Sequence, residues 1–142
     1  MTQLEKEYVK EFAFAGNATI TLQSGNTGKH FTYKLKRSKD QPNLYFIHLL
    51  HGPDNEEDYK YIGCYYKDNN YFHPAKQFQM TPRQMFPPAL RAIDYFFMKI
   101  DNLPDNLYVF HEGRCGRCGR KLTTPESIQR GLGPECYKES KR

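Results

Sequence analysis

The chain has 142 residues, of which 38% are hydrophobic and 15% aromatic, and its formal net charge is +5. This length suits one compact domain or a domain with a small appendage, and the aromatic content excludes a chain that is disordered throughout. No apolar run approaches the roughly 18 residues of a membrane-spanning helix, and the N-terminal MTQLEKEYVKEF lacks the apolar centre of a secretory signal. We therefore expect a cytoplasmic protein without a membrane partner.

The first half of the chain predicts a short helix or loose arm over residues 1–12, followed by four strands. Alternating or continuous apolar residues place these strands at Ala18–Gln23, His30–Lys36, Leu44–His51 and Lys60–Tyr66. The glycine-containing segment 24–29 predicts a hairpin between the first two strands. Gly63, inside the fourth strand, indicates a bulge or a close backbone approach.

An acidic loop, GPDNEED at residues 52–58, separates the third and fourth predicted strands. Two interpretations of Asp54, Asn55, Glu57 and Asp58 are open: a metal or catalytic role, and a solvated turn capped by Asp and Asn side chains. The second is favoured because no partner base or further ligand accompanies these carboxylates in the sequence.

The second half predicts one main helix. Residues 67–86 are rich in Asn, Gln, Pro and Lys, which indicates loop with one short strand. Pro87-Pro88 suits the start of a helix, and the apolar residues recur at helical spacing at Leu90, Ile93, Phe96, Phe97 and Ile100. We expect this helix to lie across the sheet and to bury Phe96 and Phe97. A last strand is predicted at Leu107–Phe110.

Three of the four cysteines lie in the C-terminal segment. Cys115 and Cys118 form a Cys-x-x-Cys knuckle, and Cys136 follows after seventeen residues. Such a spacing is typical of a zinc site, and an odd number of clustered thiols argues against disulfide pairing. A short helix is predicted between the knuckle and Gly131, and Gly133-Pro134 predicts a second helix with Cys136 in its first turn.

The fourth zinc ligand is left open by the sequence. His111, four residues before Cys115, is the first choice because zinc accepts imidazole nitrogen. Glu139, three residues after Cys136, is an alternative, and a water molecule is the third. We expect the metal to be structural, holding together a segment too small to fold alone. Cys64 is expected in the core, and His30, His48, His51 and His73 are expected to be surface or strand residues.

These features predict an α+β fold, in which an antiparallel sheet with one main helix carries a small treble-clef or zinc-ribbon-like zinc module. The predicted boundary separates residues 1–110 from a basic zinc-binding module at residues 111–142, the two packed as one body. From His111 onward the chain has eight cations and four acids. The basic candidates for partner binding are Arg114, Arg117, Arg120, Lys121 and Arg130. They are interpreted either as phosphate-binding residues or as a solvated basic face, with equal weight.

The stretch HEGRCGRCGRKLTTPESI, from His111, together with GLGPEC, ending at Cys136, resembles a zinc-binding domain of unknown function that is common in bacteriophage and prophage proteins. Looser similarity extends upstream through TGKHFTYKL and GPDNEEDYKYIG. The resemblance implies a phage or mobile-element origin, with Cys115, Cys118 and Cys136 as ligands and His111 as a weaker candidate. Relatives often have Trp where this chain has Phe110, a difference expected to be neutral. The resemblance implies no activity.

The first functional hypothesis is therefore a small phage or mobile-element accessory protein with a structural Zn²⁺ that is not an enzyme. It would bind nucleic acid, or a complex that handles nucleic acid, in the host cytoplasm. The alternative is an anti-CRISPR-like inhibitor of a host anti-phage defence system that acts through protein–protein contact. A metal-dependent nuclease is disfavoured, because the sequence has no further ligand set and no nucleophile with a recognisable base. The target and the oligomeric state stay open.

Overall fold

The computed structural model describes residues 1–53 and 57–141. Within this part of the chain, seven strands form one sheet whose neighbours are all antiparallel, in the order β1-β7-β2-β3-β4-β5-β6. The strands are β1 (Thr2–Gln3), β2 (Asn17–Ser24), β3 (His30–Arg37), β4 (Leu44–Leu50), β5 (Tyr59–Tyr66), β6 (Tyr71–Pro74) and β7 (Leu107–His111). The predicted antiparallel sheet is confirmed.

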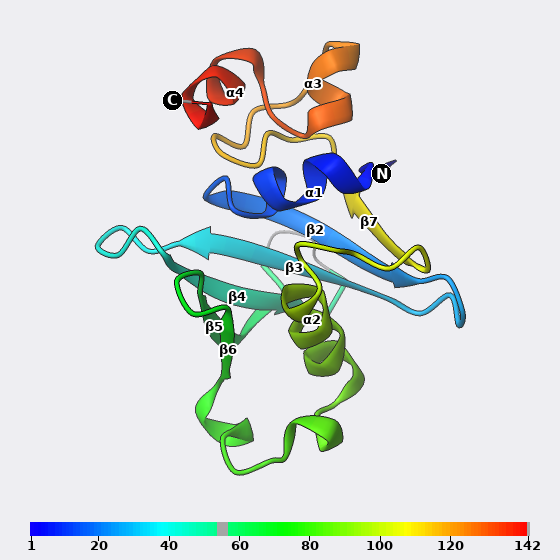
Figure 1. Cartoon of the computed structure of the whole chain (residues 1–142), viewed down its shortest axis with the longest axis vertical. Coiled ribbons are helices and arrows are strands. Elements are labelled where there is room, and N and C mark those ends of the chain that lie inside the picture. Colours follow the sequence, from blue (N-terminus) through cyan, green and yellow to red (C-terminus); the bar gives the residue numbers. More distant parts are fainter. Residues whose placement is uncertain (54–56, 142) are drawn as a thin grey trace.

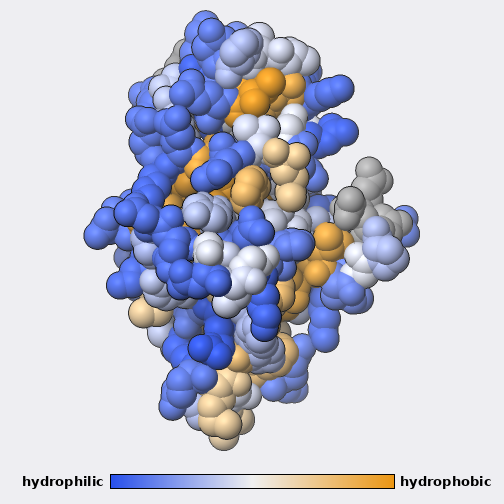
Figure 2. Space-filling view, turned by 90° about the vertical axis from the view of Figure 1, so that its right-hand side faces the viewer, coloured by the Kyte–Doolittle hydropathy of each residue, from blue (hydrophilic) through white to orange (hydrophobic). Residues whose placement is uncertain are grey.

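Four α-helices and two 3-10 turns complete the described part of the chain. They are α1 (Lys6–Ala13), η1 (Lys76–Phe78), η2 (Arg83–Met85), α2 (Pro88–Met98), α3 (Pro125–Arg130) and α4 (Pro134–Ser140). Among the described helices, none combines the length and the apolar character needed to cross a membrane. Figure 2 shows hydrophilic side chains over most of one side of the molecule, with smaller hydrophobic patches between them.

The register of β2, β3 and β4 places alternate residues of each strand on the same face. Ala18 is opposite Leu35 and Ile20 is opposite Tyr33, so the buried side chains of β2 and β3 share one face. Leu35 is in turn opposite Ile47 of β4. Successive residues of a strand point to opposite faces, so this register leaves a second face made of the intervening residues.

Gly63 produces the predicted irregularity in β5. The pairing of β4 with β5 shifts register between Ile47 and His48, opposite Gly63. A Cβ at Gly63 would lie 2.4 Å from the carbonyl oxygen of His73. The shift reverses the alternation of β5, so Cys64 is half-buried on the second face, and the prediction that it belongs to the core is wrong.

Helix α2 covers the buried face of the sheet, as the sequence predicts (Figure 1). Phe96 and Phe97 are both buried, and the ring of Phe97 stacks on Tyr65 of β5 with 3.9 Å between centroids. The hydroxyl of Tyr33 donates to the carbonyl oxygen of Ala89 at 2.7 Å. The core is therefore largely aromatic, and a hydrogen bond from the sheet fixes the start of α2.

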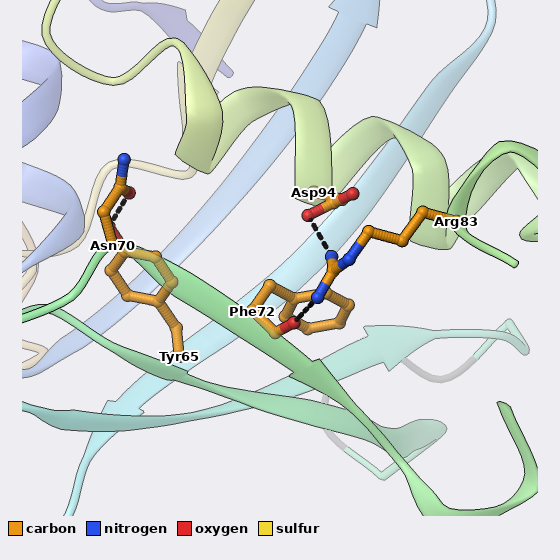
Figure 3. A network of polar contacts seen from close by, with 5 residues as sticks. All are labelled: Tyr65, Asn70, Phe72, Arg83 and Asp94. Carbon is orange, nitrogen blue, oxygen red and sulfur yellow. Dashed lines mark hydrogen bonds and ion pairs between the residues drawn. The ribbon is translucent and has the colours of Figure 1, made fainter. Parts of the chain in front are cut away.

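Arg83 connects the segment 67–86 to both the sheet and α2 (Figure 3). Its guanidinium donates to Asp94 of α2 at 2.7 Å and to the carbonyl oxygen of Phe72 in β6 at 2.5 Å. In the same region, the hydroxyl of Tyr65 bonds the side chain of Asn70. These contacts connect β6, η2 and α2 without a long regular element.

The C-terminal module, residues 111–141 of the described chain, lies on α1 and away from α2 (Figure 1). Phe12 of α1 is buried against both glycine turns of the module. A Cβ at Gly116 or at Gly131 would lie 2.8 Å or 2.4 Å from its ring. At the far end, Glu11 accepts from Ser140 at 2.7 Å and from Lys141 at 2.9 Å. Helix α1 is thus the layer between the sheet and the module, while the predicted boundary at residue 110 stays a prediction.

Candidate metal centre

The first two thiols lie on a tight hairpin that follows β7. The amide of Cys115 donates to the carbonyl oxygen of Arg120 at 2.8 Å, and Gly119 donates back to Cys115 at 2.9 Å. An isolated bridge between Arg114 and Lys121 closes the hairpin. Gly119 has φ +79, a conformation that costs glycine little. The hairpin places Cys115 in a buried position and Cys118 at the surface.

Two short helices return the chain to this hairpin. Thr124 caps α3 by accepting from the amide of Ser127 at 3.3 Å, and Gly131 ends it with φ +77. Helix α4 then begins at Pro134, and Cys136 lies in its first turn. The glycine stop of α3 and the start of α4 at Pro134 agree with the sequence prediction. The local turn chemistry therefore determines where the third thiol lies.

The three sulfur atoms form one group. The sulfurs of Cys115, Cys118 and Cys136 all lie within 4.8 Å of one another, and among the described residues they are the only such group that could hold a metal ion. Thiolates bound tetrahedrally to one zinc at about 2.3 Å lie about 3.8 Å apart. The thiols therefore need little rearrangement to bind a metal ion together.

Backbone amides stabilise the thiolate of Cys115. Its sulfur accepts from the amides of Arg117 at 3.4 Å and Gly133 at 3.3 Å. Burial raises the pKa of Cys115, but hydrogen bonds from the backbone of Cys118, Gly133 and Arg117 outweigh it and lower the pKa to about 7. The amides of Gly116 and Gly119 donate to carbonyl oxygens instead.

Cys136 shows the opposite shift. Burial and the two neighbouring thiols raise its pKa to about 11. One thiolate therefore forms readily in the group, and a second is opposed by the first. A bound cation would remove this repulsion and displace the remaining protons.

His111 lies outside the thiol group. It is 1% exposed at the end of β7, and its Nδ1 accepts from the amide of Gly113 at 2.9 Å. Its Nε2 lies 2.6 Å from the carbonyl oxygen of Ile128, so the neutral ring donates there. Burial lowers the pKa of this imidazole. With both nitrogens bonded to the backbone, neither has a lone pair free for a metal, and the geometry opposes His111 as the fourth ligand.

The acidic candidates, and the histidines expected to be surface or strand residues, are also outside the group. Glu139 lies on α4 one turn after Cys136, and neither it nor Glu57 or Asp58 belongs to the thiol group among the described residues. Asp54 and Asn55 lie outside the described residues. His30, His51 and His73 are exposed and His48 is half-buried. The structure thus brings together the three predicted cysteines and no predicted oxygen or nitrogen ligand.

A comparison with known protein families gives a match that coincides with this centre. Residues 105–140 match a family of unknown function, DUF6011. The DUF6011 segment contains β7, the hairpin, α3 and α4, and with them all three clustered cysteines. No curated protein and no solved structure is significantly similar to the chain. The match supports treating the thiol group and its supporting turns as a unit, and it assigns that unit no activity.

Four of the predicted partner-binding cations lie on the hairpin that holds Cys115 and Cys118. Arg114, Arg117, Arg120 and Lys121 are all exposed on the hairpin. Within the described part of the chain, no ion pair neutralises any of these four. Arg130 differs, because it is half-buried with its guanidinium 3.9 Å from the ring centroid of Tyr137. It therefore supports α3 and α4 from inside the segment.

Proposed function

We propose that Cys115, Cys118 and Cys136 hold a structural zinc ion. The donor set supports this metal, because clustered thiolates on a knuckle and a helix start are typical of zinc sites. The remaining position falls to Glu139 or to water, since the ring nitrogens of His111 are engaged elsewhere. The metal supplies charge neutralisation and cross-linking for a segment with a small hydrophobic cluster. Among the described residues, that cluster has Cys115, Leu122 and Leu132 buried at its centre.

We further propose that the zinc-bound module binds nucleic acid, or a complex that handles it, as part of a small accessory protein that is not an enzyme. The observation that carries this proposal is the set of four exposed cations on one hairpin, without neutralising partners among the described residues. Lysine and arginine side chains placed in this way bind phosphate groups through charge and hydrogen bonding. A phage or mobile-element origin rests on the sequence resemblance alone.

Binding is measured by fluorescence anisotropy of labelled single- and double-stranded DNA and RNA, with zinc-loaded protein at two salt concentrations. The Arg114/Arg117/Arg120→Ala variant should lose most of the affinity. Its salt dependence should fall as well, because each lost phosphate contact removes about 0.7 to 0.9 from the slope of log affinity against log salt. All three side chains are exposed, so folding should be unaffected.

A matched control removes the same charge elsewhere. Lys76, Arg91 and Lys99 are exposed and belong to η1, α2 and the end of α2. The triple alanine variant at these positions should bind nearly as well as the unaltered protein. Equal losses of affinity in the two triple variants would mean that binding depends only on net charge. That result would contradict a specific site on the hairpin. No binding at low salt would favour a protein partner, as in the defence-inhibitor hypothesis.

A further inference from the structure

The second face of the sheet has no described helix packed against it (Figure 1). Two adjacent rows of its residues cross the central strands. One row contains Thr19, Lys34, His48 and Tyr61, and the next contains Asn17, Lys36, Phe46, Cys64 and His73. Neither row contains an Asp or a Glu. We call these nine residues the open face.

Two large aromatic side chains are exposed in the middle of the open face. Phe46 is 36% and Tyr61 is 42% exposed, and their ring centroids lie 6.5 Å apart. The rings of His48 and Tyr61 meet in a T-shaped arrangement with 5.5 Å between centroids. Exposed rings grouped on a sheet are unusual for a surface that meets only water, and they offer flat surfaces on which bases can stack.

Cations border these rings. Lys34 and Lys36 lie beside His48 and Phe46 in the two rows, and Lys34 lies 4.2 Å from the ring centroid of Tyr59. Burial lowers the pKa of His48, and the neighbouring charges of Lys36 and Lys34 lower it further. The face therefore combines stacking surfaces with the charge that phosphate requires.

A groove joins the open face to the C-terminal module. It has a volume of about 430 Å³, and its lining includes Lys34 and Lys36 on the sheet and Arg114 and Gly119 on the hairpin. One acid, Glu112, also lines it. The groove therefore runs from the two lysines of the open face to Arg114 and to Cys115 of the thiol group.

We propose that the open face binds single-stranded nucleic acid, with bases stacked on Phe46 and Tyr61 and phosphates at Lys34 and Lys36. This inference rests on the proposed nucleic-acid binding and names its substrate class. Bases in a duplex stack on one another and do not offer their faces to a protein surface, whereas unpaired bases do. The strand continues through the groove toward Arg114.

The test compares a single-stranded RNA and a single-stranded DNA of about 12 nucleotides, a length typical of such sites, with their duplexes and with an abasic strand. The Phe46→Ala/Tyr61→Ala variant should bind both single strands about tenfold or more weakly, since each stacked base contributes strongly. Phe46→Tyr/Tyr61→Phe retains both rings and should bind like the unaltered protein.

Two controls separate loss of stacking from loss of folding. Tyr95 is 44% exposed on α2, on the other side of the sheet, and Tyr95→Ala should leave affinity unchanged. The unaltered protein should bind the abasic strand as weakly as the Phe46→Ala/Tyr61→Ala variant binds the natural strand. This second result requires no substitution.

The outcomes distinguish this inference from the proposed function. Unchanged single-strand affinity in the Phe46→Ala/Tyr61→Ala variant, with loss in the Arg114/Arg117/Arg120→Ala variant, would overturn the open-face inference alone. Preference for duplex over single strand would also overturn it. Weaker single-strand binding by the Phe46→Ala/Tyr61→Ala variant, with unchanged binding by the Arg114/Arg117/Arg120→Ala variant, would support the inference. It would contradict the proposed role of the hairpin. Absence of all nucleic-acid binding would overturn both.

Discussion

Gly63 shows how one residue determines which side chains reach each face of the sheet. It lies in β5 with φ +155, where the carbonyl oxygen of His73 and the ring of Phe72 leave no room for a side chain. The register shift beside it turns Cys64 toward the open face while Tyr65 remains in the core. Without this shift, Tyr61 and Tyr65 would point to the same side of the strand.

Substitution of Gly63 should therefore be much more costly than substitution of another glycine with positive φ. We expect Gly63→Ala to lower the free energy of unfolding by about 2–4 kcal/mol, since the new Cβ overlaps backbone. Gly28 has φ +76, and a Cβ at this position would have no other atom within 4 Å, so Gly28→Ala should cost only about 1 kcal/mol. Urea denaturation of both variants measures the difference, and equal costs would contradict the packing explanation.

Helix α1 is the element that connects the two halves of the molecule. Its Phe12 fills the space above two glycines of the C-terminal module, and its ring lies 5.7 Å from that of His111. Phe12 also belongs to the main hydrophobic core of the sheet and α2, together with Val9. The short amphipathic pattern of residues 1–12 predicts the helix but contains no information about this bridging position.

Truncation of Phe12 should destabilise both the C-terminal module and the main core. Phe12→Ala is expected to lower the free energy of unfolding by about 3–5 kcal/mol, the usual cost of removing a buried ring. Amide hydrogen exchange should become faster in α3 as well as in β2, because the same ring supports the module and the core. Phe46→Ala, which removes an exposed ring, serves as the control and should have a much smaller effect. Faster exchange confined to α1 would contradict a bridging role.

Much of the element order could be predicted from sequence because hydrophobic period and turn residues act locally. The alternation of His30–Arg37 predicts β3, and Pro87-Pro88 marks the start of α2. Thr124 caps the start of α3 and Gly131 ends it. The strand order could not be predicted in the same way. The pairing of β7 with both β1 and β2 depends on contacts between residues 83 to 109 positions apart, from Ser24–Leu107 to Thr2–His111.

The same distinction applies to the site. The three thiols could be predicted because their turns are encoded within a few residues of each cysteine. The position of His111 could not, because its partner Ile128 lies 17 residues away and competes with any metal for the ring. The alternation in HFTYKLK places Lys34 and Lys36 on the side opposite Tyr33 and Leu35, but it contains no information on whether a helix covers that side.

At the scale of the whole molecule, the structure has a covered face and an open face with the thiol group at one end. The core lies between the sheet, α1 and α2, while the C-terminal module rests on α1 (Figure 1). Of the net charge of +5 of the chain, most lies from His111 onward. If a metal fixes the hairpin, it also fixes Arg114 at the end of the groove that leads to the open face.

The most direct test of this account is the metal content of the purified protein, measured by native mass spectrometry with elemental analysis. We predict one zinc ion per chain, lost in Cys118→Ser and retained in Cys64→Ser. Cys118 is exposed and Cys64 lies outside the thiol group, so a folding defect from lost packing is not expected in either variant. Loss of the metal should open the C-terminal module to proteolysis while the sheet stays folded. A metal-free protein, or a Cys118→Ser variant with unchanged zinc and unchanged melting temperature, would contradict the account.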